Sequence, residues 1–168
     1  MNSTSSDLGS TASDLGSTSS DLGLWTKNVL ESLHSSSYHP IENHTLASIH
    51  QEIVDILAIE QIEESREIQE KLKDYRYVGE ICDLFRGRHI RWIRVYTENV
   101  NGDRVRIPNP VLTNGGIVTD IKFQKNGIYI QCKNPRNQFM LFKFDHCILF
   151  QKLTAEECVL LMFQKDRL

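Results

Sequence analysis

The sequence lacks any apolar run near the roughly 18 residues that a membrane span requires, so we expect no membrane contact. Its Ser- and Thr-rich start lacks the basic segment followed by an apolar one that marks a secretory signal. No two cysteines have Cys-x-x-Cys spacing, and without a secretory context all four are expected to be reduced thiols: Cys82, Cys132, Cys147 and Cys158. These absences predict an intracellular protein of the cytoplasm.

The common catalytic motifs are also missing. The chain has no Gly-rich phosphate loop, no Gly-x-Ser-x-Gly and no His-Glu-x-x-His. A zinc site needs several suitable ligands within reach, whereas the six histidines are scattered: His34, His39, His44, His50, His89 and His146. We therefore expect no enzyme, no catalytic residues, no cofactor and no metal site.

Charge is unevenly distributed along the 168 residues. Residues 1–76 carry 13 acids against 5 bases, and residues 77–168 carry 9 acids against 14 bases, which gives the net charge of −3. One interpretation is an acidic arm and a basic domain that meets an anionic partner. The other is two solvated surfaces that differ in sign.

Residues 1–23 are predicted to be a disordered tail, because residues 3–23 repeat one heptapeptide, Ser-Thr-Ser/Ala-Ser-Asp-Leu-Gly, three times. Each repeat offers one leucine, which buries too little apolar surface to offset the entropy of ordering. Leu8, Leu15 and Leu22 are candidate protein-interaction residues that gain avidity by repetition. The alternative is a repeat expansion without a role.

Residues 24–43 are predicted to be a short amphipathic helix and a linker. Trp25, Val29 and Leu33 share one side of the helix and are further candidates for protein interaction. The same stripe could instead pack on the core of the protein itself. Ser35 to Ser37 and Pro40 indicate the linker.

Residues 44–76 are predicted to be one long acidic helix that begins near Thr45. Its first half has a narrow apolar stripe, and its second half is dominated by glutamates between Glu60 and Glu70. Residues 77–86 are predicted to be a short helix with Gly87 as its C-terminal cap.

Residues 115–150 are predicted to be an antiparallel meander. The Asn-Gly pair at 126–127, flanked by alternating apolar residues, indicates a two-residue hairpin turn with positive φ at both positions. That turn places Phe123 opposite Ile130 and Asp120 opposite Lys133. Phe123 is therefore expected in the core.

The whole pattern predicts an α+β protein. Residues 77–168 are expected to form a small antiparallel β-barrel or curved sheet of about five strands, SH3-like in size, preceded by the long helix. A capping box from Thr154 to Glu157 opens a C-terminal helix. Because residues 159–162 are all apolar, this helix is expected to close the fold by covering the sheet.

Arginines interleave with aromatic residues between positions 86 and 106, which suits a barrel that binds single-stranded nucleic acid. The candidate contacts with nucleic acid or an acidic partner are Arg86, Arg88, Arg91, Trp92, Arg94, Arg104 and Arg106. In the alternative interpretation, Trp92 faces the core and the arginines are a solvated rim or pair with the acidic helix.

Three segments are similar to small uncharacterised β-rich proteins of large DNA viruses: Gly87-Arg88-His89-Ile90-Arg91-Trp92-Ile93, Gly115-Gly116-Ile117-Val118 and Phe150-Gln151-Lys152-Leu153. The resemblance covers residues 77–160. It implies a virion or virus-factory protein and carries over no catalytic residue.

Together these features predict a non-catalytic protein-interaction or scaffold module, virion-associated if the resemblance holds. Its helical arm would engage another protein or a second copy of itself. The alternative is a nucleic-acid-binding small β-barrel that uses the arginine and aromatic strand.

Overall fold

The computed structural model describes residues 41, 43–63 and 65–164, so the predictions for residues 1–40 lie outside the described residues. The described chain is α+β, with three α-helices, eight strands and two short 3₁₀ helices. In chain order they are α2 (Leu46–Ile59), α3 (Ser65–Lys71), β1 (Tyr75–Val78), η1 (Ile81–Asp83), β2 (His89–Arg94), β3 (Tyr96–Glu98), β4 (Arg104–Arg106), β5 (Gly116–Gln124), β6 (Gly127–Lys133), β7 (Phe139–Lys143), η2 (Phe144–His146), β8 (Cys147–Lys152) and α4 (Ala155–Gln164).

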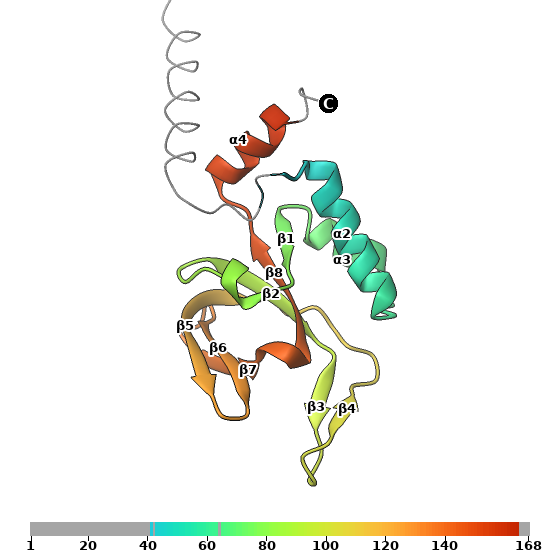
Figure 1. Cartoon of the computed structure of the whole chain (residues 1–168), viewed down its shortest axis with the longest axis vertical. Helices are drawn as coiled ribbons and strands as arrows, with labels where there is room; N and C mark the ends of the chain where they lie inside the picture. Colours follow the sequence, from blue (N-terminus) through green and yellow to red (C-terminus); the bar gives the residue numbers. More distant parts are fainter. Residues whose placement is uncertain (1–40, 42, 64, 165–168) are drawn as a thin grey trace, which may run out of the picture. The chain divides into compact units, whose positions relative to one another are not determined.

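Six strands form one sheet in the order β1-β8-β2-β5-β6-β7, and all neighbours are antiparallel. Strands β3 and β4 form a separate two-stranded ribbon (Figure 1). The prediction of an antiparallel α+β fold is confirmed, with more strands than the expected five.

The sheet is open, so of the two predicted forms, a barrel or a curved sheet, the closed barrel is wrong. Strands β2 and β5 pair only at His89 and Ile90, and beyond them the backbone of Trp92 hydrogen-bonds to Thr113 instead. A barrel closes only when its two edge strands pair with consistent tilt and stagger. Here β1 and β7 remain the edges, and the ring of Trp92 stacks on that of Phe142 with centroids 4.3 Å apart.

The predicted single helix over residues 44–76 is also wrong. Helix α2 ends at Ile59, and Gln61 has a left-handed φ of 49° that turns the chain. The turn has a physical reason, because it allows Ile62 and Ile68 to enter the same buried cluster as Leu57. The glutamates between these positions mask this second apolar stripe in the sequence.

Residues 75–78, expected at the end of one helix and the start of the next, form strand β1 instead. Tyr75 lies opposite Lys152 of β8, and Val78 lies opposite Leu149. The predicted helix over 77–86 is reduced to the 3₁₀ turn η1. Side chains from both faces of β1 are buried, which favours a strand between two apolar layers.

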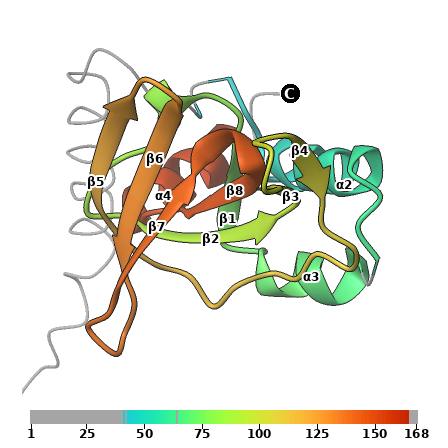
Figure 2. The ribbon, with the colours of Figure 1, turned by 90° about the horizontal axis from the view of Figure 1, so that it is seen from below.

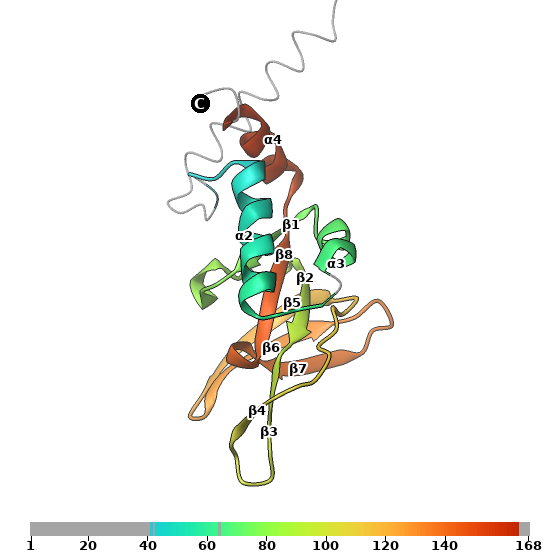
Figure 3. The same ribbon diagram turned by 90° about the vertical axis from the view of Figure 1, so that its right-hand side faces the viewer.

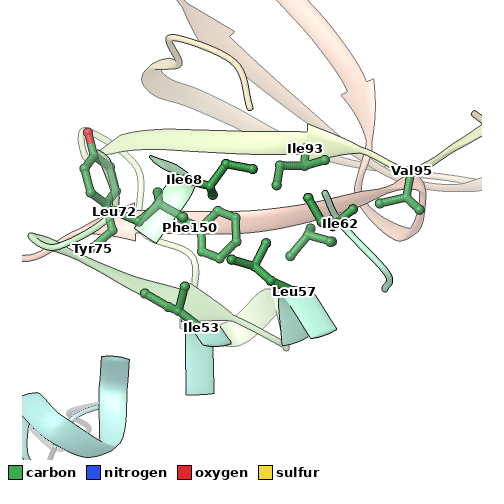
Figure 4. Packing of buried hydrophobic residues seen from close by; sticks show 10 residues of the cluster. Ile53, Leu57, Ile62, Ile68, Leu72, Tyr75, Ile93, Val95 and Phe150 are labelled. Atoms are coloured by element: carbon green, nitrogen blue, oxygen red, sulfur yellow. The ribbon is translucent and has the colours of Figure 1, made fainter. Parts of the chain in front are cut away.

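Two apolar clusters lie on opposite faces of the sheet. One lies between the sheet and helices α2 and α3, with the ring of Phe150 among isoleucines and leucines (Figures 3 and 4). The other occupies the opposite face and contains Trp92 and Phe142. Strand β2 contributes to both, since Ile90 and Trp92 face the second cluster and Ile93 faces the first. The alternative interpretation, in which Trp92 faces the core, is therefore confirmed for this residue.

The β5–β6 hairpin exists, but its predicted register is wrong. Phe123 lies opposite Ile128, two residues from its predicted partner, and Asp120 lies opposite Gln131. The two loop residues are 125 and 126, and positive φ occurs at Gly127 but not at the preceding asparagine. In the expected turn, Asn126 and Gly127 are the two central residues. In the observed turn, the central residues are Lys125 and Asn126, and Gly127 follows them.

Helix α4 begins with the predicted capping box. The Thr154 amide donates to the Glu157 carboxylate at 2.7 Å, and the Glu157 amide donates to the Thr154 hydroxyl at 3.1 Å. However, α4 continues beyond the end of β8 and contacts α2, so the prediction that it covers the sheet is wrong (Figure 1). Leu161 is buried, whereas Met162 and Phe163 are exposed.

Candidate interaction surface

Large apolar side chains are exposed on the outer face of strands β5 and β7, which lie on either side of β6 (Figure 2). Phe139 and Leu141 of β7 are 63% and 50% exposed, and Ile117 of β5 is 41% exposed. Their cross-strand register joins these residues, because Ile117 and Phe139 both lie opposite Lys133 of β6. Such exposed apolar surface is typical of an interaction site.

Strand β7 is apolar on both faces although it lies at an edge. Its residues Met140 and Phe142 face the buried cluster, while Phe139 and Leu141 face outward. Edge strands in natural proteins usually carry charges, proline or a bulge that blocks pairing with another chain. Strand β7 has none of these before its last residue, Lys143.

The backbone of β7 has unpaired groups along its outer edge. Its hairpin with β6 closes with the Asn134 amide donating to the Gln138 carbonyl at 3.0 Å. Bonded and non-bonded pairs alternate along an antiparallel ladder, so the amides and carbonyls of Phe139, Leu141 and Lys143 point away from β6. The Gln131 carbonyl supports this pattern. Gln131 lies opposite Leu141, and its carbonyl points away from β7, because it accepts a hydrogen bond from the Thr119 hydroxyl on β5.

The single charged side chain of β7 is neutralised. The Lys143 ammonium donates to the Glu98 carboxylate at 2.9 Å, and the side chain of Lys143 is only 14% exposed. The hydrogen bond from Lys143 lowers the pKa of Glu98, and the same bond raises the pKa of Lys143. The open edge therefore carries no free charge along its length.

Phe123 lies at the tip of the β5–β6 hairpin, on the same face as Ile121 and therefore on the opposite face from Phe139 and Leu141. It is 73% exposed, so the prediction that it lies in the core is wrong. The observed register places Phe123 at the last pair but one before the turn, beyond the buried pair of Ile121 and Ile130. The tip thus overhangs the cluster that the rest of the hairpin covers.

The arginines predicted to form one surface are dispersed. Arg86 forms an ion pair with Asp120 at 2.7 Å. The Arg91 guanidinium lies over the ring of Tyr75, on the helix side of the sheet, 5.6 Å from its centroid. Arg94 is exposed and, three residues further along β2, lies on the opposite face from Arg91.

Two further arginines flank one aromatic ring of the β3–β4 ribbon. The Arg104 guanidinium lies 3.6 Å from the ring centroid of Tyr96, and that of Arg106 lies 5.9 Å from it. Arg106 also forms an ion pair with Glu60 at 3.1 Å. The alternative interpretation, in which arginines pair with the acidic helical segment, holds for this residue.

Trp92 and Arg88 complete the predicted arginine and aromatic surface. Trp92 is buried against Phe142, so its ring is not available to stack on a nucleic-acid base. Arg88 is half-buried just before β2. The structure therefore does not bring the seven predicted residues together.

A polar cluster joins β1 and β2 across the end of β8, the strand that lies between them. The Tyr75 hydroxyl lies 3.1 Å from Nδ1 of His89, and Arg91 lies over the same tyrosine ring. Burial, followed by the charges of Arg91 and Lys152, lowers the pKa of His89. The imidazole is thus held neutral over more of the acidic range than a solvated histidine.

This lowered pKa predicts a pH-dependent stability. An unfolded histidine has a pKa of about 6.5, so below that value the unfolded chain binds more protons than the folded one. The contribution of His89 to the free energy of unfolding is present above about pH 6.5 and is lost as the pH falls toward the folded pKa. Urea unfolding at about pH 7.5 and 5.5 measures how much the free energy of unfolding falls on acidification, and this decrease should be smaller for His89→Asn than for the wild type. An equal decrease in the two proteins would show that the pKa of His89 is not lowered by folding.

Two of the four cysteines, Cys132 and Cys147, have thiols whose pKa is strongly raised. Burial raises the pKa of Cys132 to about 11 and that of Cys147 to about 12, so both thiols stay protonated near neutral pH. Among residues 41, 43–63 and 65–164, no group of His, Cys, Asp and Glu could hold a metal ion.

In the same part of the chain, no helix combines the length and hydropathy needed to cross a bilayer.

The remaining predicted interaction residues lie outside the described residues: Leu8, Leu15, Leu22, Trp25, Val29 and Leu33. Sequence reasoning missed Phe139 and Leu141. The signal was present, because residues 139–142 are an unbroken apolar run without a protecting charge, but a central strand gives the same pattern.

Comparisons with protein-family models, with curated proteins and with solved structures found no match for the chain. The resemblance to β-rich viral proteins stays a prediction.

Proposed function

We propose that the protein is a non-catalytic protein-interaction module that binds a strand of a partner protein along β7. One observation carries the proposal: an edge strand with unpaired backbone groups exposes Phe139 and Leu141 and has no free charge to block pairing. Adding a strand to such an edge gives affinity through main-chain hydrogen bonds and specificity through alternate side chains.

The surroundings of β7 support a protein partner over a nucleic acid. The exposed large side chains of β7 itself are apolar, and its one cation, Lys143, is already paired with Glu98. On the neighbouring strand, the Lys133 ammonium lies over the Phe139 ring, 5.7 Å from its centroid. Phosphate binding needs clustered free cations, whereas the arginines are dispersed, and Arg86 and Arg106 are neutralised by carboxylates.

The test compares Leu141→Lys with Ile59→Lys in affinity capture with the full chain, measured by quantitative mass spectrometry. Ile59 is 71% exposed at the end of α2 and gives a matched change from isoleucine to lysine away from the sheet edge. We expect Leu141→Lys to reduce captured protein by more than about tenfold, because an unpaired charge would be placed inside the interface. Equal capture by both variants would overturn the proposal.

A second arm of the test addresses nucleic acid directly. Labelled single-stranded oligonucleotide is titrated against the wild type and Arg91→Glu at low and moderate salt. If the proposal is right, the wild type should show no oligonucleotide binding that is weakened both by added salt and by Arg91→Glu. Tight, salt-sensitive binding that Arg91→Glu weakens would favour a nucleic-acid-binding function instead.

A further inference from the structure

We infer that the strand added to β7 is β7 of a second copy of this chain, in a two-fold symmetric antiparallel pair centred on Leu141. This inference rests on the proposed function and deepens it by naming the partner. The two six-stranded sheets would then join into one continuous sheet across the molecular two-fold axis.

The backbone phase of β7 fits this pairing. The groups that point outward belong to Phe139, Leu141 and Lys143, which are spaced evenly about Leu141. The Lys143 carbonyl is already used, because Lys143 is the N-cap of η2 and its carbonyl accepts the first hydrogen bond of that helix. An antiparallel partner centred there places Leu141 opposite the partner's Leu141, and Phe139 opposite the partner's Lys143. The amide and carbonyl of each Leu141 then meet those of the other copy, and the Phe139 carbonyl meets the partner's Lys143 amide.

The side chains agree with the same register. A two-fold axis perpendicular to the sheet keeps the outer faces of both copies on one side, so the two Leu141 side chains become cross-strand neighbours with Cα atoms about 5.5 Å apart. The exposed Leu141 side chain would be covered by the partner's Leu141, and Phe139 would lie opposite the partner's Lys143 and diagonal to the partner's Leu141. An isologous contact requires this self-complementarity.

The charges at the two ends of β7 are complementary under this symmetry. Exposed Arg136 lies in the loop before β7, and exposed Asp145 lies in η2 after it. Within the described residues neither side chain forms an ion pair. Antiparallel pairing brings the end that carries Arg136 to the end that carries the partner's Asp145, and it does so twice.

The same features argue for a second copy over an unrelated strand. The centre of the edge is apolar and uncharged, so two copies meet there without repulsion, because Lys143 is already bound to Glu98. An acidic partner strand would find no free cation along β7. The opposite signs at the two ends match an antiparallel copy of the edge itself.

The test is a charge exchange at the proposed symmetry axis, with sedimentation equilibrium and native mass spectrometry on the full chain. The wild type should form a dimer whose population rises with concentration. Leu141→Lys and Leu141→Glu should each weaken dimerisation by more than about tenfold, because residue 141 meets itself across the axis. An equimolar mixture of the two variants should recover a dimer made of one chain of each.

Ile59→Lys is the matched control, because Ile59 is 71% exposed at the end of α2, away from the outer face and the edge of the sheet. It should leave the dimer unchanged. A monomeric wild type, a dimer insensitive to both Leu141 variants, or a mixture that stays monomeric would overturn the inference. If the wild type is monomeric and Leu141→Lys still loses captured protein, the second copy is wrong while the proposed function stands.

Discussion

Replacing Phe150 with alanine is expected to lower the free energy of unfolding by about 3–5 kcal/mol. The ring is fully buried in β8, a central strand that pairs with β1 on one side and β2 on the other. It packs among side chains from α2, α3 and both neighbouring strands (Figure 4). A cavity there would be lined by several elements that cannot all move inward, so little of the loss would be recovered. Urea unfolding followed by circular dichroism measures the change.

Phe123→Ala is the matched control for this prediction. The substitution removes the same ring from the tip of the β5–β6 hairpin, where Phe123 is 73% exposed. Its cost should stay within about 0.5 kcal/mol, which is usual for surface positions. If Phe123→Ala lowered the free energy of unfolding as much as Phe150→Ala, the Phe123 ring would have to be buried in solution. The exposed position of the hairpin tip would then be wrong.

The strands and their buried faces could be predicted where two independent signals agree. In β2, the alternative interpretation placed Trp92 toward the core, and its ring is buried in the cluster on one face while Ile93 is buried in the cluster on the other. The capping box at Thr154 fixed the start of α4, because its reciprocal hydrogen bonds depend on local spacing alone.

The hairpin register could not be decided from the pattern of side chains. Moving the turn so that Gly127 follows its two central residues shifts the register by two positions. A shift of two leaves every residue on the same face, so apolar alternation fits both registers equally well. The irregularity between Val118 and Asp120 also changes the phase of β5, and nothing in the local sequence announces it.

The break between α2 and α3 could not be predicted because it depends on tertiary burial. Four of the five residues 60–64 are polar, which suits a continuous solvated helix. The chain turns there because Ile62, Ile68 and Leu72 gain burial against Phe150 once it folds back. Helix propensity is a weak preference that such packing overrides.

The candidate site was missed for a related reason. Burial on both faces of a strand is expected for a central strand, and residues 139–142 have that composition. Whether a strand is central or at an edge depends on the order of strands in the sheet, which the sequence of one strand does not encode. The arginines of residues 86–106 were grouped by proximity in sequence, but strand alternation and the separate β3–β4 ribbon disperse them.

Gly115→Ala is expected to cost about 2–5 kcal/mol, from left-handed backbone strain together with a steric clash. Gly115 has a φ of +82°, and an added Cβ would lie 1.9 Å from the carbonyl oxygen of Ile90 and 2.8 Å from Cε1 of His89. The carbonyl is backbone and belongs to the short β2–β5 pairing, which joins the two halves of the sheet, so it cannot yield without loosening that junction.

Gly102→Ala separates the two causes, because Gly102 has nearly the same φ, +84°, with open space around its Cβ position. It should cost only the strain, about 1–2 kcal/mol. Equal costs at the two positions, measured by urea unfolding, would mean that Ile90 moves freely and that the two halves of the sheet are joined more loosely than their register indicates.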